Sequence, residues 1–422
     1  MAKITNIKGR QVFDSRGNPT VEAEVYSDDG YYSSAIVPSG ASTGRHEAFE
    51  LRDKENKNYL GKGVLSSVKN INLTISKKLK NFNIFDQAKI DETLIDLDGT
   101  QQKKKLGANS ILAVSVATSK LAAISKKIPL FKYLGGATSN KIPLPLMNII
   151  NGGVHANNSL RIQEFMIRPE KPKTFSEATR ICFLVIQKLK SLINNKNLST
   201  TVGDEGGFAP SLNTNEKAIE LIIEAIEKAG FKPGTDLSIC LDIASNELYK
   251  DGKYSVQSLK FENAKSTIDY YLKLVDKYPI KSIEDPFSED DWTSWASFMR
   301  FLKLNKINTQ IVGDDLFVTN KKRLNRGIKE ETANAILIKP NQIGTLTETM
   351  EVINLAHKNG FKTIISHRSG DSEDTFIADL AVATNSSQIK TGSLARSERV
   401  AKYNRLLRIE EELGKHAKMA NI

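Results

Sequence analysis

Polar or ionisable residues follow almost every short apolar run in the second part of this 422-residue chain. The runs cover residues 237–241, 280–283, 310–312, 335–338 and 362–365, and segments with helical periodicity separate them. Strands that alternate with helices are typical of parallel βα units, whose strands all end on one side of the sheet. The residues after the runs are therefore expected to lie close together: Asp242, Glu284, Asp314, Lys339, Ser366-His367-Arg368 and Lys390.

Two architectures bring strand ends together. A closed βα barrel gathers them at one mouth, whereas an open doubly wound sheet places its ligand at a single switch point. Because polar residues follow so many runs, the closed barrel is favoured. No GxGxxG motif follows a predicted strand and no Walker loop is present, so neither nucleotide-binding motif is expected.

The first part of the chain predicts a different kind of domain. Residues 20–26 alternate in polarity, Asp28-Asp29-Gly30 forms a turn, and residues 31–37 return as a second strand. Helical patterns follow and end in a segment rich in Ala and Ser over 107–126. Gly135-Gly136 and nearby prolines interrupt the pattern. We therefore predict a domain of strands and helices over 1–137 and a barrel over 138–422.

The clearest helical pattern lies between residues 215 and 230. Apolar residues recur there at helical spacing, with Asn215 as the predicted N-cap and Gly230 just past the end. No run reaches the roughly 18 apolar residues of a membrane span. The first residues contain no apolar core of a secretory signal, which favours a cytoplasmic location.

The formal net charge of +11 permits non-specific attraction to nucleic acids and anionic surfaces. The basic residues are spread along the chain, however, and no nucleic-acid motif accompanies them. We expect no specific nucleic-acid or membrane partner, and the positive field suits a small anionic substrate. Cys182 and Cys240 lie in apolar runs and are expected to be buried free thiols in a reducing compartment.

Three acids, Asp242, Glu284 and Asp314, end separate predicted strands. Gathered in one mouth they would repel one another, and a hard divalent cation would remove the conflict. Oxygen ligands without nearby His or Cys favour Mg²⁺. The alternative is that each acid forms a salt bridge with a lysine or arginine.

Lysines and a second group of acids complete the candidate site. Lys339 and Lys390 end later strands; a lysine beside cations shifts towards its neutral form and can act as a base, although each could simply neutralise an acid. Glu164 and Glu205 could share one proton and so supply a general acid. His155 either contacts the same ligand or is a hydrogen-bonded loop residue.

The segment 38–44, PSGASTG, has the composition of a mobile lid, or of an ordinary surface loop. Arg368 and Ser369 suit an oxyanion. Together these groups favour metal-assisted removal of a proton beside a carboxylate. The residues alone do not name the substrate.

Ordered motifs covering residues 4–413 make the sequence similar to enolase, the phosphopyruvate hydratase family. The motifs are DSRGNPTVE (14–22), PSGASTG (38–44), GANSILAVS (107–115), NGGVHANN (151–158), QEFMI (163–167), VGDEGGFAP (202–210), SIEDPF (282–287), GDDLFVTN (313–320), ILIKPNQIG (336–344), SHRSG (366–370) and IKTGS (389–393).

The resemblance implies reversible dehydration of 2-phospho-D-glycerate to phosphoenolpyruvate. Lys339 would remove the C2 proton, and Glu205 would protonate the leaving C3 hydroxyl. The first Mg²⁺ would bind Asp242, Glu284 and Asp314, and Ser42 would help to hold a second Mg²⁺ recruited with the substrate. The remaining implied residues contact the substrate or support the acid: His155, Gln163, Glu164, Arg368, Ser369 and Lys390.

The implied fold is a small N-terminal α+β domain followed by a TIM-like (β/α)8 barrel of the enolase type, ββαα(βα)6. A homodimer or an octamer of dimers is implied, with a second RNA-related or cell-surface role in some members. Leu160-Arg161 departs from the family, where an acidic residue is usual. Two alternatives remain: a related enzyme acting on a non-phosphorylated hydroxy acid, which Ser42, Arg368 and Ser369 argue against, and a non-catalytic RNA or cell-surface binding protein.

Overall fold

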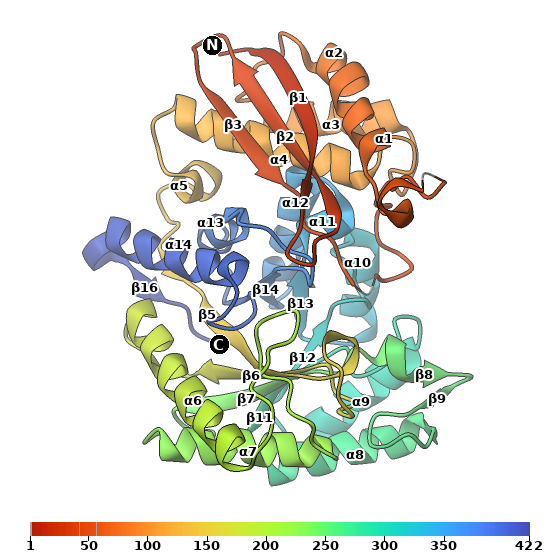
Figure 1. Cartoon of the computed structure of the whole chain (residues 1–422), viewed down its shortest axis with the longest axis vertical. Helices are drawn as coiled ribbons and strands as arrows, with labels where there is room; N and C mark the ends of the chain where they lie inside the picture. The colour runs from red at the N-terminus through yellow and green to blue at the C-terminus, as the bar shows by residue number, and fades with distance from the viewer. Residues whose placement is uncertain (1, 42, 56) are drawn as a thin grey trace.

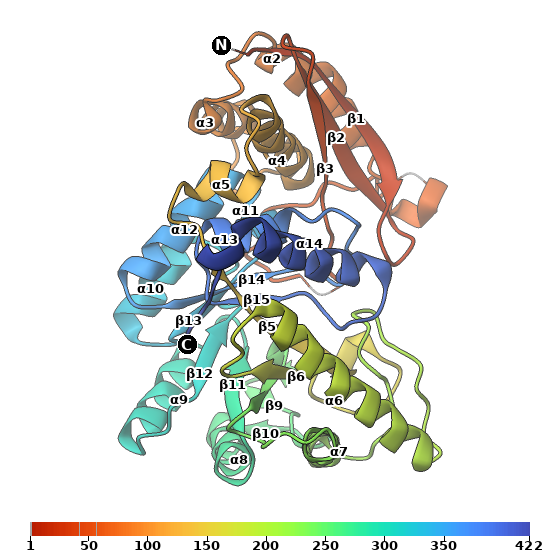
Figure 2. The same cartoon turned by 90° about the vertical axis from the view of Figure 1, so that its left-hand side faces the viewer.

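The computed structural model describes residues 2–41, 43–55 and 57–422. Figure 1 shows a small first domain, coloured red to orange, above a larger barrel whose strands and helices run from yellow to blue. Seen from the side, the helices of the second part surround the barrel strands (Figure 2). The segment after the third strand descends from the first domain towards the barrel, where Ser39 pairs with Gly370.

The first domain packs helices on one antiparallel sheet of order β1-β2-β3. The predicted hairpin is confirmed, because Tyr26 pairs with Tyr32 across the turn. Alternate residues of the middle strand, Val21, Ala23 and Val25, are fully buried. The elements are β1 (Ile4–Phe13), β2 (Pro19–Ser27), β3 (Tyr32–Ile36), α1 (Leu65–Lys69), α2 (Ser76–Leu79), α3 (Gln87–Asp98), α4 (Ala108–Ser125) and α5 (Leu130–Gly135).

Helix α4 is the one described helix that is long and apolar enough, by length and composition, to cross a membrane. In the fold, 83% of that window is buried. It packs against β2 and β3, as the central helix of a core does.

The second part is a closed eight-stranded barrel. Strand β6 is antiparallel to both of its neighbours, and the other adjacent pairs are parallel. The strands in chain order are β5 (Leu144–Asn151), β6 (Glu164–Pro169), β7 (Leu237–Asp242), β11 (Ile280–Glu284), β12 (Gln310–Gly313), β13 (Ala335–Ile338), β14 (Lys362–Ser366) and β15 (Gln388–Lys390).

Helices follow the strands in the order ββαα(βα)6, as the resemblance implies. They are α6 (Phe175–Asn195), α7 (Asn215–Lys228), α8 (Ala264–Lys277), α9 (Trp292–Leu304), α10 (Lys321–Glu330), α12 (Leu346–Lys358), α13 (Phe376–Ala383) and α14 (Ser397–Leu413), with the short α11 (Pro340–Ile343) before α12. Minor strands are β4 (Lys141–Ile142), which pairs with β16 (Lys418–Met419), and a small sheet of β8 (Tyr249–Lys250), β9 (Lys253–Tyr254) and β10 (Glu262–Asn263).

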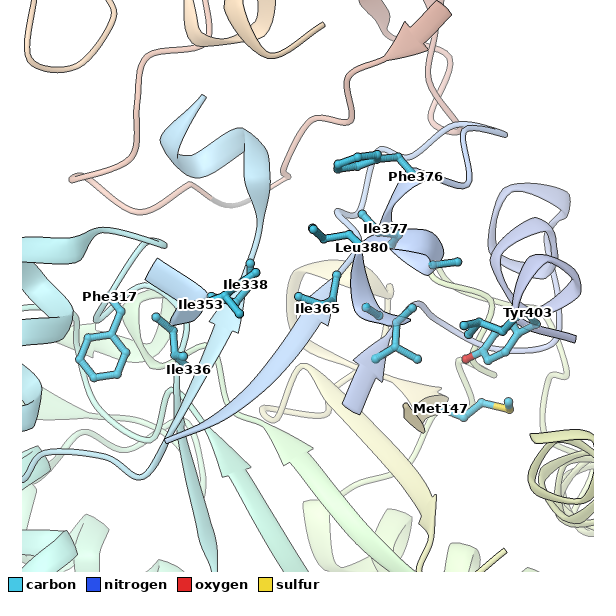
Figure 3. Close-up of a cluster of buried hydrophobic side chains, with 14 of the residues drawn as sticks. Met147, Phe317, Ile336, Ile338, Ile353, Ile365, Phe376, Ile377, Leu380 and Tyr403 are labelled. Carbon is cyan, nitrogen blue, oxygen red and sulfur yellow. The ribbon is translucent and has the colours of Figure 1, made fainter. Parts of the chain in front are cut away.

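The period of two along the strands separates two apolar cores. On β13, Ile336 and Ile338 belong to the large core between strands and helices, and Figure 3 shows them beside Ile353 of α12. The alternate residues fill the barrel, as in other barrels of this kind. This inner cluster consists of Leu146, Met166, Cys240, Val312, Ala335, Leu337 and Ile364.

Both cysteines are free and buried, as predicted. Burial raises the pKa of the Cys240 thiol to about 11. Both thiols therefore pack as small apolar side chains.

Helix α7 begins one residue away from its predicted cap. Thr214 is the N-cap, and its hydroxyl accepts a hydrogen bond from the Lys217 amide at 3.3 Å. Asn215 is buried instead, and its carbonyl oxygen accepts the amides of Arg161 and Ile162 at 3.1 and 3.2 Å. The prediction of Asn215 was wrong because Thr214 offers the same capping chemistry one residue earlier.

A partly buried ion pair joins the two domains. Asp374 of the barrel accepts hydrogen bonds from Lys120 Nζ of α4 at 2.6 and 2.7 Å, and from the Ile36 amide of β3 at 3.1 Å. Burial alone would raise the pKa of Asp374, but Lys120 and the backbone donors hold it below its usual range. The ionised carboxylate therefore stabilises the domain contact.

We expect Asp374→Asn to lower the free energy of unfolding by about 2–4 kcal/mol at pH 7, because Lys120 loses its partner. A depressed carboxyl pKa contributes stability above the unfolded-state pKa of about 4, and this contribution disappears as pH falls through the folded-state value. Urea unfolding at pH 7 and below about pH 4 measures the difference. Glu92→Gln in the exposed Lys89–Glu92 pair is the control. An equal loss at both pH values would contradict the linkage.

Candidate active site

The predicted strand ends meet at one mouth of the barrel. Asp242 and Glu284 end the neighbouring strands β7 and β11 and lie side by side in register. Ser42 lies outside the described residues; Gly40 of the same loop lines the pocket at this mouth. The pocket lining also includes the predicted residues His155, Gln163, Glu164, Glu205, Asp242, Asp314, Lys339, Arg368, Ser369 and Lys390.

Lys390, at the end of β15, forms ion pairs with three acids. Its buried ammonium lies 2.8 Å from Glu284 Oε1, 2.9 Å from Asp242 Oδ2 and 3.2 Å from Glu164 Oε1. Burial lowers the pKa of Lys390, but these carboxylates outweigh burial and raise it well above its usual range. Lys390 is therefore a fixed positive charge at the mouth.

Lys339, at the end of β13, forms an ion pair with Asp314 at 2.5 Å. The other Asp314 oxygen accepts a hydrogen bond from Gln342 Nε2 at 2.9 Å. Burial lowers the pKa of Lys339, but Asp314 outweighs it and raises the pKa. This arrangement favours the charged ammonium, whereas the sequence predicted a neutral amine beside bound cations; the role of Lys339 stays a prediction.

The mouth holds more buried negative charge than its lysines balance. Burial, followed by the charge of Asp242, raises the pKa of Glu284 well above its usual range, and Glu284 Oε2 has no hydrogen-bond partner among the residues that the structure describes. Burial and Asp314 raise the pKa of Asp315 to about 8. Oxygens of Asp285, Asp314 and Asp315 lie within 4.8 Å of one another. These oxygen ligands fit a hard divalent cation such as Mg²⁺.

Asp285 binds backbone amides. Its two oxygens accept the backbone amides of Asp314 and Asp315, each at 2.9 Å. Asp285 thus orients the strand end that carries Asp314, and the metal set of Asp242, Glu284 and Asp314 stays a prediction.

Two glutamates and two histidines form the other side of the pocket. His155 Nδ1 lies 3.7 Å from Glu164 Oε1 and 3.7 Å from Glu205 Oε1. His367 Nε2 lies 3.4 Å from Glu205 Oε1, and Asn148 Nδ2 donates to Glu205 Oε2 at 3.2 Å. All five side chains belong to buried residues.

The pKa values of the two glutamates shift in opposite directions. Burial and the charge of Glu205 raise the pKa of Glu164 well above its usual range. Burial would raise the pKa of Glu205 as well, but His367 and His155 outweigh it and hold it well below its usual range. Burial lowers the pKa of His367 to about 4. A proton shared by the two glutamates therefore favours Glu164.

Arg368 and Ser369 follow β14 at the side of the pocket nearest the first domain. Glu47 accepts from both Arg368 nitrogens, Nη1 at 3.0 Å and Nη2 at 3.2 Å. Ser369 Oγ accepts the Ala41 amide at 2.6 Å. The loop of the first domain is thus joined directly to the two residues expected to bind an oxyanion.

Several polar residues at the site had no assigned role in the sequence predictions, among them His367, Asn148 and Glu47. His367 stands between Ser366 and Arg368, so the strand-end pattern already marked its position. Asn148 is a polar residue inside the buried strand β5, which is itself a signal of a polar partner. Glu47 gave no signal, because an acid in a loop is usually solvated.

Comparisons with known proteins agree with this geometry. The family model "Enolase, N-terminal domain" matches residues 4–134, and "Enolase, C-terminal TIM barrel domain" matches residues 139–422. The enolase of Pelagibacter ubique (strain HTCC1062) is 64% identical over 422 residues, the full length of both chains. The chain therefore belongs to the enolase family of Mg²⁺-dependent hydro-lyases.

Proposed function

We propose that Lys339 and Glu205 carry out the two proton transfers of the enolase reaction, the reversible dehydration of 2-phospho-D-glycerate to phosphoenolpyruvate in glycolysis and gluconeogenesis. Lys339 Nζ takes the C2 proton, and the C–H electron pair forms the enolate. That pair then forms the C2–C3 double bond as the C3 hydroxyl takes a proton from Glu205 and leaves as water. The observation that carries this proposal is that an amine and a carboxyl pair line one pocket of buried acids.

The amine is held where a base is needed. Lys339 follows β13 directly, and its backbone amide donates to Thr319 Oγ1 at 2.9 Å, which fixes the strand end. Two Mg²⁺ would serve the site, one on Asp242, Glu284 and Asp314, and a second recruited with substrate near Ser42. Bound there, the ions supply positive charge that stabilises the enolate and weakens the hold of Asp314 on the Lys339 proton.

The acid receives its proton from within the pocket. Burial and the charge of Glu205 raise the pKa of Glu164, and His155 Nδ1 lies 3.7 Å from an oxygen of each glutamate. We infer that Glu164 and Glu205 exchange this proton, so that Glu205 is protonated when the hydroxyl leaves. Lys390 remains charged throughout and stabilises the developing carboxylate dianion.

The substrate is oriented by the remaining predicted residues. Arg368 and Ser369 suit the phosphate, since a guanidinium binds phosphate through paired hydrogen bonds. Gln163 has a buried side-chain oxygen without a hydrogen-bond partner, which suits a substrate hydroxyl. A hydroxy acid without phosphate would offer Arg368 no phosphate oxygens to bind.

We further propose that residues 1–137 cap the mouth of the barrel over 138–422, and that the chain works in the cytoplasm as a homodimer or an octamer of dimers. Enolase resemblance supports these assignments. A second role with RNA or at the cell surface has only the +11 charge in its favour. RNA affinity that fails to fall steeply with salt would exclude ordinary phosphate-backbone binding.

Metal removal tests the reaction. We expect phosphoenolpyruvate to form from 2-phosphoglycerate with Mg²⁺, to fall below about 1% of that rate in excess chelator, and to recover when Mg²⁺ is added back. Absorbance of the new double bond measures the product. D-glycerate, which lacks the phosphate, is the control substrate and should not react. Undiminished turnover in chelator would contradict the proposal.

A further inference from the structure

Arg399, on the first turn of α14, is completely buried beside the acid group. Its Nη1 lies 2.5 Å from His367 Nδ1 and donates to the Arg368 carbonyl at 2.6 Å. Its Nη2 donates to the carbonyls of Ser369 at 2.6 Å and Asp204 at 3.2 Å. One guanidinium therefore holds both the segment after β14 and the loop that carries Glu205.

The contact with His367 has only one chemically consistent form. A guanidinium has hydrogen-bond donors and no acceptor, so His367 Nδ1 must accept from Arg399. A neutral imidazole that accepts at Nδ1 carries its proton on Nε2. His367 Nε2 lies 3.4 Å from Glu205 Oε1, so this hydrogen lies beside the acid, although the pair does not have the geometry of a hydrogen bond.

We propose that Arg399 is a positioning residue that fixes His367 as the Nε2–H tautomer and so keeps a hydrogen-bond donor beside Glu205. An imidazolium would place an N–H against the guanidinium, so Arg399 also keeps His367 uncharged. The acids nearest the guanidinium are Asp371, 3.6 Å from Nη1, and Glu398, 3.4 Å from Nε. They balance part of its charge but leave the Nδ1 contact in place.

The surrounding backbone is shaped to admit this side chain. Gly392 has φ +75°, and a Cβ there would lie 3.0 Å from Arg399 Cδ and 2.5 Å from the Glu205 carbonyl. The Ser393 amide, one residue later, donates to that same carbonyl at 2.9 Å. Only a glycine fits between Arg399 and the backbone of Glu205.

The consequence for the reaction depends on the proposed role of Glu205. As Glu205 gives its proton to the leaving hydroxyl, it becomes a carboxylate, and a donor at Oε1 stabilises that change. In the other tautomer, Nε2 would offer a lone pair and would compete with the hydroxyl for the proton. Arg399 therefore serves the dehydration step and leaves removal of the C2 proton by Lys339 unaffected.

The tautomer can be measured without any activity. The chain has five histidines, so ¹⁵N-histidine labelling gives few ring signals, and loss of one set in His367→Gln assigns His367. We expect protonated Nε2 and unprotonated Nδ1 in the wild type near neutral pH. Arg399→Lys, which keeps a donor, should retain this state, and folded Arg399→Met should lose it. Protonated Nδ1 or an imidazolium in the wild type, or an unchanged tautomer in folded Arg399→Met, would overturn the proposal.

Kinetics test the second part of the proposal, the effect of Arg399 on the dehydration step. Arg399→Met should slow dehydration by about 10- to 100-fold, within what a general acid contributes, while C2 proton exchange changes less than about twofold. Arg399→Lys, which retains the tautomer, should dehydrate at close to the wild-type rate. Arg405→Lys, on the same helix but paired with Asp379, is the matched control and should change neither. Equal losses in both steps would assign Arg399 a purely structural role. If the wild type itself does not dehydrate 2-phosphoglycerate, the proposed function fails while the tautomer measurement still stands.

Discussion

Lys339→Ala is expected to abolish exchange of the C2 proton of 2-phosphoglycerate with solvent. A positioned base contributes roughly 10²–10⁴ in rate, and no second amine is available to replace it. Lys390 is the other buried amine of the pocket, but three carboxylates within 3.2 Å keep it charged. Deuterium incorporation at C2, followed by NMR in heavy water with Mg²⁺, measures the loss.

Two further variants separate loss of the base from loss of structure. Lys339→Gln can still donate a hydrogen bond to Asp314 but cannot take a proton, so it should be as inactive as Lys339→Ala. Lys362→Ala replaces an exposed lysine at the opposite end of the next strand, β14, and should exchange normally. Exchange at the wild-type rate in Lys339→Ala would disprove the assignment of the base.

The barrel was predictable because one local pattern carries it. Each predicted run from 237 onward became a barrel strand, and the polar residue after it stands at the mouth, as Asp242 and Lys390 do. A strand-end position is set by local sequence and by the parallel topology, so the convergence of these residues needs no knowledge of distant contacts.

What the sequence did not predict depends on side-chain partners brought together by the fold. The charged state of Lys339 depends on Asp314, which is 25 residues away in the sequence and whose carboxylate lies 2.5 Å from the ammonium. The ion pair between Glu47 and Arg368 joins residues 321 positions apart in the sequence. Apolar periodicity carries no information about such pairs, and their energies depend on burial that only the folded structure supplies.

The roles within the acid group were the hardest to predict. The sequence indicated that Glu164 and Glu205 share a proton but could not say which one holds it. The contacts favour Glu164, since His367 and Asn148 both face Glu205 and neither bonds to Glu164 in a described contact. The residue that orients His367 lies on the last long helix, in a segment whose pattern indicates only an amphipathic helix.

Glu205→Gln is expected to retain C2 exchange and to lose dehydration by about 10²–10⁴-fold. Glutamine has the same shape and can accept the Asn148 hydrogen bond, but it has no proton to give to the leaving hydroxyl. The base Lys339 and its partner Asp314 are untouched, so the enolate still forms and returns to 2-phosphoglycerate carrying deuterium. One reaction in heavy water measures both steps, as deuterium in recovered substrate and as phosphoenolpyruvate formed.

The ratio of the two rates, rather than either rate alone, decides the role of Glu205. A variant that is merely misfolded loses both activities together, and Glu224→Gln, in an exposed pair on α7, should lose neither. Lys339→Ala loses exchange first and dehydration with it, because no enolate forms. Glu205→Gln must therefore differ from Lys339→Ala by retaining exchange; loss of both activities in both variants would mean that base and acid do not act in separate steps.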